Sequence, residues 1–443
     1  MRREKYDEPT GGLLRFLEES PTAFHAVAGL GKVLDERGYR KLDERERWEI
    51  SPGGKYYVTR NSSSIIAFQI GDSLEDYSFK VAASHCDSPC FRIKEEAEIS
   101  VGDRYTKLNT EGYGSMLCST WLDRPLSAAG RAVLKTAGGW SERLVMLDRD
   151  LFLIPSLAIH MDREANEGRS FNKQIDMLPL FGEGGMKGDL KKLVAEELAA
   201  EPEEIYGMDL YLYSRVKPAV WGRRDEFLSA SRLDDLECAW TSLQGFVEAR
   251  PEGNVNVFAC FDNEEVGSNT KQGAGSTFLA DVLLRINDSL SMTGEDYRRA
   301  LASSFMVSCD NAHAVHPNYP EKSDPDNCVY MNRGIAVKCH AGQQYTSDAV
   351  SIALWKGICE RAGVPLQFFA NRSDMRGGST LGNIAMSQVS MNAVDVGLPQ
   401  LAMHSAYETA GVRDVGYMIR AMRQFFDSGI GEYTLCRERV GEP

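Results

Sequence analysis

Residues 255–268 read Val-Asn-Val-Phe-Ala-Cys-Phe-Asp-Asn-Glu-Glu-Val-Gly-Ser. The stretch begins as a mostly apolar run, which is typical of a buried strand, and ends in the carboxylates Asp262, Glu264 and Glu265. Like charges packed this closely repel one another, and burying one without a partner is costly. The stretch therefore predicts a strand in the interior of a sheet whose carboxyl end faces a cation.

Similar apolar runs recur along the chain and alternate with helical patterns. Strands are predicted at 56–60, 64–70, 79–85, 255–261, 304–310, 365–372 and 400–405. Helical periodicity covers 12–40 and ends at Gly38, and further helices are predicted over 234–249, 276–290, 295–303, 346–361 and 413–427. The alternation over 230–430 predicts an α/β fold with a mostly parallel central sheet flanked by helices on both faces.

The stretch from about 90 to 225 has a different character. It combines β-rich pieces with a Gly-rich patch, FGEGGMKG, and an acidic helical segment, KKLVAEELAAEPEEI. We interpret it as a second, largely β domain inserted into the first. The predicted division is a discontinuous domain of residues 1–90 and 230–443, and an inserted domain of residues 91–229.

Bulk composition excludes several classes of function. The 443 residues carry 50 basic and 64 acidic side chains, a net charge of −14, so a nucleic-acid partner has no electrostatic support. The most apolar stretch, 151–159, is too short to cross a bilayer, and no apolar segment follows the basic N-terminal residues. Ten scattered cysteines without a CxxC pair are typical of reduced thiols. We expect a cytoplasmic protein with no membrane partner.

Imidazoles and carboxylates recur where apolar strands end. His85 ends FKVAASH, His404 follows QLAM, Asp310 follows SFMVSC, and Asp234 opens a helix in SRLDDL. Each has a simpler explanation alone: a hydrogen-bonded histidine at the rim, or an aspartate that caps the next helix. Glu264 and Glu265 could likewise belong to a solvated loop. Because ligand sites of open α/β sheets lie at the carboxyl ends of strands, convergence on a metal is the better interpretation of the whole set.

Two imidazoles with several carboxylates and no dedicated thiolate suit zinc, manganese or cobalt, and suit a pair of ions that share a carboxylate. Adjacent residues of an extended segment project in opposite directions, so Glu264 and Glu265 are expected to differ in role. One can bind metal while the other takes a proton from the water that the ions activate. In His85-x-Asp87 the carboxylate of Asp87 lies on the same face as the imidazole and can orient it.

Longer motifs, in a constant order over nearly the whole chain, resemble the M18 family of metallo-aminopeptidases, the group that contains aspartyl aminopeptidase and the vacuolar aminopeptidase. The resemblance implies a zinc-peptidase-like catalytic domain with an inserted β-rich oligomerisation domain. The motifs that carry it are ASHCDSPCFRIK (83–94), EGYGSMLCSTWLDRPLSAAGR (111–131), LAIHMDRE (157–164), FNKQIDMLP (171–179), SASRLDDL (229–236), FDNEEVGS (261–268), DNAHAVHPNYPEK (310–322), NRGIAVK (332–338), GGSTLG (377–382) and AMHSAYE (402–408).

This resemblance implies a ligand set for two divalent ions, zinc first, with manganese or cobalt as alternatives. One ion is expected on His85, Asp234 and Asp310. The second is expected on Asp234, Glu265 and His404, so that Asp234 bridges the pair. Asp235 stands where many relatives have Asn, but it lies outside this set.

The resemblance also implies roles beyond the ligands. Glu264 matches the general acid and base, and Asp87 the carboxylate that orients the first imidazole. His160 matches a histidine that the inserted domain lends to the active site of a neighbouring subunit. Similar proteins assemble as dimers and then as tetrahedral dodecamers, which implies a homo-oligomer that admits short peptides.

Four further residues are candidates for substrate binding, each with a simpler alternative. Lys338 resembles a lysine that meets an acidic side chain of the substrate, or it packs at a strand end with its ammonium in water. His313 lines the substrate pocket or holds its own loop by hydrogen bonds. Asp374 and Gly378 belong to a Gly-rich turn that in the family lies beside the substrate amine, or they form only a tight turn.

The predicted function is removal of N-terminal residues from short peptides, by attack of hydroxide generated at the metal ions with Glu264 as general base. An acidic N-terminal residue is the first expectation and a neutral aliphatic one the second. Tyr407 stands where an Arg is common in the family. Because it is not among the expected ligands, this difference bears on the substrate preference and not on catalysis. The alternatives are a co-catalytic zinc deacylase or carboxypeptidase on the same scaffold, and a non-catalytic binding protein.

Overall fold

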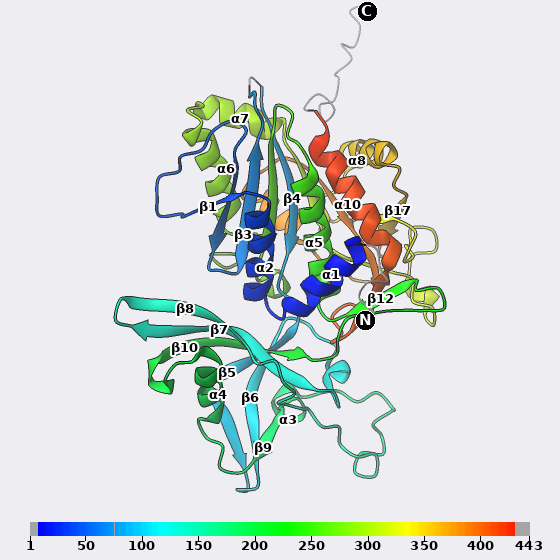
Figure 1. The fold of residues 1–443 in the computed structure, drawn as a ribbon. Helices are drawn as coiled ribbons and strands as arrows, with labels where there is room; N and C mark the ends of the chain where they lie inside the picture. The colour runs from blue at the N-terminus through cyan, green and yellow to red at the C-terminus, as the bar shows by residue number, and fades with distance from the viewer. Residues whose placement is uncertain (1–7, 75, 430–443) are drawn as a thin grey trace, which may run out of the picture.

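The computed structural model describes residues 8–74 and 76–429, which form a mixed α/β fold with sheets of nine, six and five strands (Figure 1). The α/β class predicted from the sequence is therefore confirmed. The α-helices are α1 (Glu8–Glu19), α2 (Ala23–Glu36), α3 (Lys173–Asp176), α4 (Asp189–Leu198), α5 (Leu233–Glu248), α6 (Phe278–Ser289), α7 (Gly294–Ala302), α8 (Ala349–Ala362), α9 (Leu381–Met386) and α10 (Val412–Asp427).

The nine-stranded sheet positions the candidate site. Its strands in spatial order are β1 (Arg40–Leu42), β2 (Lys55–Arg60), β3 (Ser64–Ile70), β13 (Val255–Phe261), β4 (Phe79–His85), β14 (Phe305–Cys309), β18 (Asn392–Gly397), β16 (Ile335–Cys339) and β17 (Leu366–Ala370). The neighbours β13, β4, β14 and β18 pair in parallel. Their carboxyl ends therefore meet at one edge, which brings together the side chains that follow them.

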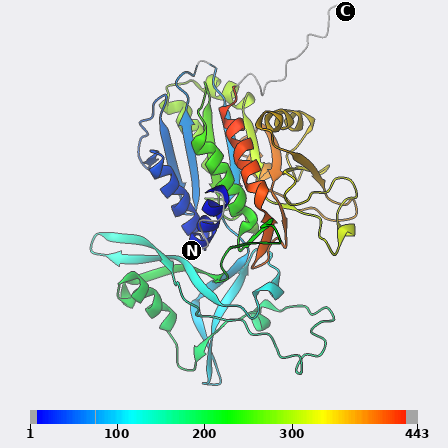
Figure 2. The same ribbon diagram turned by 45° about the vertical axis from the view of Figure 1, so that its right-hand side comes forward.

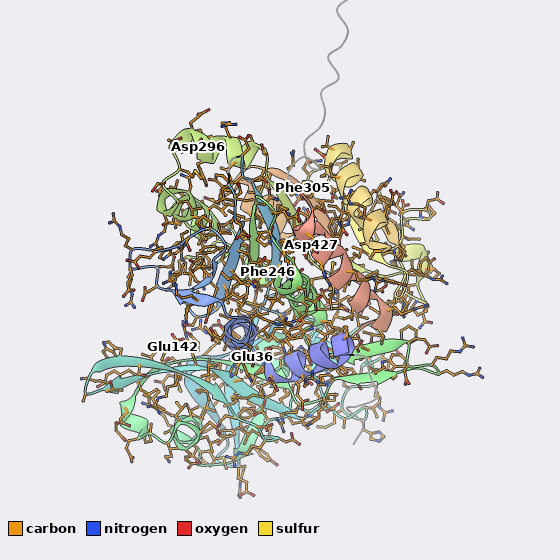
Figure 3. All side chains as sticks on the ribbon, turned by 45° about the horizontal axis from the view of Figure 1, so that its top comes forward. Glu36, Glu142, Phe246, Asp296, Phe305 and Asp427 are labelled. Carbon is orange, nitrogen blue, oxygen red and sulfur yellow. The ribbon has the colours of Figure 1, made fainter. Side chains whose placement is uncertain are left out.

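Helices cover both faces of this sheet (Figure 2). The core on one face is built with α1, α2, α5, α8 and α10, and the core on the other with α6, α7 and α9. Phe246 of α5 and Phe305 of β14 are fully buried in the first of these cores (Figure 3). Every residue of β4 and β13 is buried, which explains why both strands read as continuous apolar runs.

The six-stranded sheet is antiparallel throughout and lies below the nine-stranded sheet in Figure 1. It consists of β8 (Gly139–Met146), β7 (Leu126–Thr136), β10 (Ile205–Ser214), β5 (Cys90–Val101), β6 (Tyr105–Tyr113) and β9 (Leu180–Glu183). It has its own hydrophobic core, to which α4 contributes Leu190 and Val194. Because the chain passes from β4 at His85 to β5 at Cys90, this sheet faces the carboxyl end of β4.

The five-stranded sheet joins distant parts of the chain. Its strands are β11 (Ala219–Trp221), β12 (Phe227–Ala230), β20 (Glu408–Gly411), β19 (Pro399–Leu401) and β15 (Ala312–His313). Ala230 of β12 pairs with Glu408 of β20, which places the start of α5 beside the segment 402–408. β11 and all of β12 except Ala230 fall within residues 91–229, although β12 pairs with β20. The division into two domains at these boundaries stays a prediction.

The sequence prediction differs from the observed sheets in two respects: one predicted strand is too long, and some strands were not predicted. The strand predicted over 400–405 is wrong beyond Leu401, because Ala402 and His404 adopt positive φ angles of 56° and 67° in a turn. The strands β1, β16 and β18 were not predicted, although all three lie in the nine-stranded sheet. In the part of the chain that the structure describes, no helix is long and apolar enough to span a membrane.

The contact between α5 and α10 tests the packing of the larger core. A Cβ atom at Gly245 would lie 2.5 Å from Met422 Cβ and 2.9 Å from the carbonyl oxygen of Ile419, so the helices would have to separate. We expect Gly245→Ala to destabilise the protein by about 1–3 kcal/mol, measured by thermal unfolding. The control Gly416→Ala lies on α10, where the nearest atom, in the Arg420 side chain, is 3.6 Å away. It should be neutral or stabilise by up to about 1 kcal/mol, and equal effects of both variants would contradict this packing.

Candidate metal centre

Four acidic or imidazole side chains reach the site directly from the carboxyl edge of the nine-stranded sheet. His85 is the last residue of β4, opposite the last residue of β13, and Asp310 follows β14. Glu264 and Glu265 follow β13 in a short 3-10 turn over Glu264–Val266. Because these strands are parallel neighbours, their ends lie side by side, as the apolar runs and the polar residues after them predict.

Two further side chains come from outside the parallel strands. Asp234 is the second residue of α5 and has non-helical φ and ψ angles, and its peptide bond to Asp235 is cis. His404 lies in the turn between β19 and β20. The pairing of β12 with β20 brings these segments to the same sheet edge.

The first group of possible metal ligands consists of His85, Asp234 and Asp310. One ligand atom from each lies within 4.8 Å of the others, and all three residues are buried. His85 Nε2 is 3.5 Å from Asp234 Oδ1. A second overlapping group, Asp234, Glu265 and His404, meets the same condition. His404 Nε2 is 3.3 Å from Asp234 Oδ2 and 3.2 Å from Glu265 Oε1.

Both imidazoles present the same nitrogen to the centre. His85 Nδ1 donates to the carbonyl oxygen of Asp87 at 3.1 Å, and His404 Nδ1 donates to the carbonyl oxygen of Ser115 at 2.8 Å. A carbonyl oxygen can only accept, so the proton of each neutral ring lies on Nδ1. Each Nε2 then carries a free lone pair directed at the carboxylates, which is the arrangement of a metal-binding histidine.

The residues present fit a divalent metal ion. Asp234 Oδ1 and Glu265 Oε1 are buried and have no hydrogen-bond partner among the described residues. A buried carboxylate oxygen without a donor is costly unless a cation satisfies it. The groups offer imidazole nitrogen and carboxylate oxygen and no thiolate, a set that zinc, manganese and cobalt accept.

Asp87 supports the centre through several hydrogen bonds. Its carboxylate accepts the backbone N–H groups of Glu264 and Glu265 at 3.0 and 3.1 Å, and the hydroxyl of Tyr113 at 2.7 Å. The sequence predicts that this carboxylate orients His85. The carboxylate oxygen is in fact 3.5 Å from His85 Nδ1, and the closer contact is made by the Asp87 carbonyl. Asp87 therefore positions the loop after β13 as well as the imidazole.

The buried carboxylates of Glu408 and Asp235 accept hydrogen bonds from the backbone of predicted metal ligands. The sequence did not predict this role for either residue. Glu408 accepts the N–H of Asp234 at 3.1 Å and the N–H of His404 at 2.7 Å. Asp235 accepts the N–H of His85 at 3.1 Å. Their only signal in the sequence is membership of the motifs AMHSAYE and SRLDDL, because the groups that they bind are remote along the chain.

Burial and charge shift the pKa values of the centre in the absence of a cation. Burial raises the pKa of Glu264 to about 8, which the positive charge of His85 opposes and the carboxylate of Asp310 reinforces. Burial also raises the pKa of Glu265 to about 7. Although burial lowers the pKa of His404, its contacts with Asp234 and Glu265 raise it to about 11. Bound cations would displace these protons and lower the pKa values.

The structure places the other predicted site residues at varying distances from this centre. Lys338 is close, with Nζ 3.6 Å from Asp310 Oδ1. His313 is exposed on β15, with its ring centroid 6.2 Å from that of Phe369. Asp374 is exposed and paired with Arg372 at 2.8 Å. The roles of these residues in substrate binding stay predictions.

Two predicted site residues and one substituted position lie outside the metal-ligand groups. Gly378 is exposed in the loop before α9. His160 is exposed in a turn of the segment between Ile154 and α3, and it belongs to none of the ligand groups found in the described residues. Tyr407 donates to the carbonyl oxygen of Lys217 at 3.2 Å.

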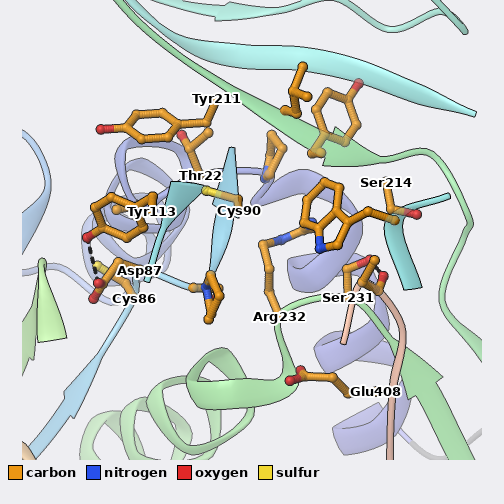
Figure 4. Close-up of a pocket in the computed structure, with 18 of the residues that line it drawn as sticks. Thr22, Cys86, Asp87, Cys90, Tyr113, Tyr211, Ser214, Ser231, Arg232 and Glu408 are labelled. Carbon is orange, nitrogen blue, oxygen red and sulfur yellow. Dashed lines mark hydrogen bonds between the residues drawn. The ribbon is translucent and has the colours of Figure 1, made fainter. Parts of the chain in front are cut away.

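A cavity of about 50 Å³ lies between the start of α2 and the six-stranded sheet (Figure 4). Asp87 and Glu408 contribute to its lining, and Tyr113 donates to Asp87 there. None of the five predicted metal ligands lines it. A cavity of this size has room for a few water molecules.

Comparison with known proteins agrees with this geometry. The family model described as "Aminopeptidase I zinc metalloprotease (M18)" matches residues 16–426. A curated relative from Clostridium novyi (strain NT), described as a probable M18 family aminopeptidase 2, is 46% identical over 94% of this chain and 98% of its own length.

Solved structures of similar proteins have the same fold. The structure described as the cryo-EM structure of the Ape4 and Nbr1 complex is 35% identical, with a TM-score of 0.91 over 95% of this chain and 85% of the matched chain. The structure described as the S. cerevisiae mApe1 dodecamer is 26% identical, with a TM-score of 0.85 over 96% of this chain and 98% of its own. The chain therefore belongs to the M18 family of zinc metalloproteases and is a metal-dependent aminopeptidase.

Proposed function

We propose that the enzyme works with two divalent ions, zinc in the first place and manganese or cobalt as alternatives. His85, Asp234 and Asp310 would hold one ion, and Asp234, Glu265 and His404 the other. The observation that carries this proposal is the position of Asp234, whose Oδ1 lies 3.5 Å from His85 Nε2 and whose Oδ2 lies 3.3 Å from His404 Nε2. Each oxygen therefore faces a different ligand group, as a bridging carboxylate requires.

Glu264 is the proposed general base and acid. Divalent ions supply an acidified water as nucleophile and polarise the carbonyl of the scissile bond. The Glu264 side chain is 14% exposed, with Oε2 4.0 Å from His85 Nε2, so it lies at the edge of the cluster where a substrate can reach it. It takes the proton of the attacking water and then donates it to the leaving amine. The carboxylate of Asp87 accepts the backbone N–H of Glu264 and so holds Glu264 in place.

The proposed substrates are short peptides with a free N-terminal amine, acidic or neutral aliphatic in their first residue. The proposed layout is a parallel-sheet catalytic domain, residues 1–90 and 230–443, with an inserted dimerisation domain, residues 91–229. Support for a homo-oligomer, a tetrahedral dodecamer built from dimers, comes from the similar fold of the mApe1 dodecamer. We place the enzyme in the cytoplasm.

His160 is proposed to act in the active site of a neighbouring subunit, where it would steady the developing oxyanion. Its own chain does not bring it to the metal ligands. The segment around it is rich in exposed apolar side chains, since Leu157, Ile159 and Met161 are 45%, 48% and 75% exposed. Apolar side chains gathered in this way are typical of a surface that contacts another subunit.

The bridging role of Asp234 predicts that its removal affects both ions. In Asp234→Asn both binding affinities should fall by more than about 100-fold, because the amide cannot bridge two cations. In the matched variant His404→Gln only one affinity should fall. Titration against a chromophoric chelator, combined with elemental analysis, measures both. Retention of one ion at wild-type affinity in Asp234→Asn would contradict the bridge.

The role of Glu264 predicts that Glu264→Gln lowers kcat by about 100- to 10,000-fold, because the amide cannot accept the proton of the attacking water. Metal content should stay at the wild-type level, since Glu264 is not a ligand in the proposed set. The control Glu295→Gln, in the first turn of α7, is exposed and should have wild-type kinetics. Steady-state kinetics on an aminoacyl-anilide decide the point, and a Glu264→Gln enzyme with more than a tenth of normal turnover would rule out this base.

The role of His160 predicts complementation between subunits. His160→Ala should lower kcat by about 100-fold, as expected for the loss of one oxyanion donor. Co-expressed with Glu264→Gln, it should form mixed oligomers that are much more active than either parent, because a Glu264→Gln subunit lends its His160 to the intact Glu264 of its neighbour. The control is co-expression of His160→Ala with the double variant that carries both substitutions. These mixed oligomers contain no His160 and should stay as inactive as His160→Ala. Mixed oligomers as inactive as their parents would show that His160 does not act across subunits.

A further inference from the structure

A lysine is buried beside the proposed metal centre. Lys338 is the fourth residue of β16 and is 2% exposed, and the rest of that strand is apolar apart from Cys339. Lysine is rarely buried to this degree unless its charge is paired. The partners of this ammonium therefore indicate what it does.

The ammonium group is enclosed by groups of its own chain. Lys338 Nζ lies 3.6 Å from Asp310 Oδ1 and donates to the carbonyl oxygen of Asn311 at 3.3 Å. It also lies 5.3 Å from the centre of the Tyr345 ring, which attracts a cation through its π face. A carboxylate, a carbonyl and an aromatic ring together meet the needs of a buried ammonium without any substrate group.

The backbone of Asp310 and the side chain of Asn311 are themselves held by hydrogen bonds. The side-chain amide of Asn311 donates to Glu237 Oε2 and to the carbonyl oxygen of Leu398, each at 3.0 Å. The backbone N–H of Asp310 donates to the carbonyl of Val396 at 2.9 Å. These hydrogen bonds fix the chain segment that carries the two partners of the Lys338 ammonium.

The charge of Lys338 matters because the centre is strongly acidic. Of the lysines and arginines that the structure describes, Lys338 is the one recorded within ion-pair distance of a carboxylate of the five proposed ligands. It can therefore reduce the repulsion between Asp310 and the neighbouring Asp234 before any metal is bound. It can also select the rotamer in which Asp310 faces His85 and Asp234.

We propose that Lys338 is a positioning residue for Asp310 and does not recognise the charge of the substrate's first side chain. This inference rests on the proposed function and deepens it. Since the ammonium is committed to Asp310, an acidic N-terminal residue gains no special partner there. The ring centroids of Tyr345 and Phe369 are 6.4 Å apart, and both side chains are buried in a small hydrophobic cluster beside the end of β16, where they add no charged partner for a substrate. The enzyme should therefore cleave neutral N-terminal residues at least as well as acidic ones.

The substrate profile of the unaltered enzyme is the first test. We compare kcat/KM for aspartyl, glutamyl, leucyl and methionyl anilides with the metal-loaded full-length enzyme. We expect the neutral substrates to equal or exceed the acidic ones. A preference for aspartyl or glutamyl anilide of about 10-fold or more would overturn the proposal. No cleavage of any of them would instead contradict the proposed aminopeptidase mechanism, and the metal-binding test below remains decisive for Lys338.

The second test is Lys338→Met, which keeps an unbranched apolar stem and removes the charge. We expect the affinity for one of the two ions to fall by about 10- to 100-fold, as for other groups that orient a metal ligand. At limiting metal, kcat/KM should fall by the same factor for aspartyl and leucyl anilides, and excess metal should restore both. An unchanged metal affinity, or a selective loss of aspartyl cleavage by about 10-fold or more, would overturn the proposal.

Two further variants separate positioning from general damage to the fold. Lys338→Arg keeps the charge and should hold metal within about 10-fold of the wild-type affinity, even if Lys338→Met fails to fold. Lys80→Met is the matched control, because Lys80 is a fully buried lysine of β4 that donates to the carbonyl oxygens of Phe426 and Ser428. It should lower the melting temperature without changing metal affinity. A loss of metal affinity in Lys80→Met equal to that in Lys338→Met would overturn the proposal.

Discussion

The mutual repulsion of carboxylates at the carboxyl edge of the nine-stranded sheet is the constraint on which the centre depends. Asp234 belongs to two groups of possible metal ligands, one with His85 and Asp310 and the other with Glu265 and His404, and the ligand atoms of each group lie within 4.8 Å of one another. Burial, reinforced by the charge of Asp234, raises the pKa values of Glu265 and Asp310, and the carboxylate oxygens Asp234 Oδ1 and Glu265 Oε1 have no hydrogen-bond donor among the described residues. Such an arrangement is stable only with bound protons or bound cations. The buried acceptors are thus a direct physical reason for the family's dependence on metal.

The fold supports this cluster with hydrogen bonds from a surrounding layer of carboxylates. Asp87 accepts the backbone N–H groups of the loop after β13, Asp235 accepts that of His85, and Glu408 accepts those of Asp234 and His404. Asp87 and Glu408 each accept backbone N–H groups with both carboxylate oxygens, and Asp235 does so with one, so these acids are engaged with the protein. The outer carboxylates hold the backbone around the inner ones, and this fixes the direction in which the predicted ligands point.

The site is also incomplete within one subunit, if the proposed role of His160 is correct. The six-stranded sheet and the segment after it lie on the side of the molecule that the carboxyl end of β4 faces, yet His160 remains exposed in its own chain. In the proposed mechanism, metal binding and proton transfer would use residues of one chain, whereas oxyanion stabilisation would require a second copy. Assembly would then be a condition for full activity, and Lys338 would tune the metal site from within a single chain.

Much of the set of side chains that meet at the sheet edge could be predicted from residue types alone. Strands such as β4 and β13 are buried on both faces, so their apolar runs stand out, and the polar residues after them mark the sheet edge. The strand predicted over 400–405 is wrong beyond Leu401. An apolar run followed by a histidine resembles the end of a strand, but Ala402 and His404 form a turn. β18 escaped notice because the buried Asp395 interrupts its apolar pattern, and that aspartate is satisfied by the side chains of Thr346 and Thr380.

The sequence by itself determined the α/β class, the kinds of ligand and the family, because these depend on local periodicity and on motifs whose order is preserved. Only the tertiary structure decided which oxygen of Asp234 faces which imidazole, that Glu408 holds two ligands at once, and that Lys338 pairs with Asp310. The physical reason is distance along the chain. His85 and Asp235, for example, are 150 positions apart, and no local pattern encodes the strand pairing that brings them into contact.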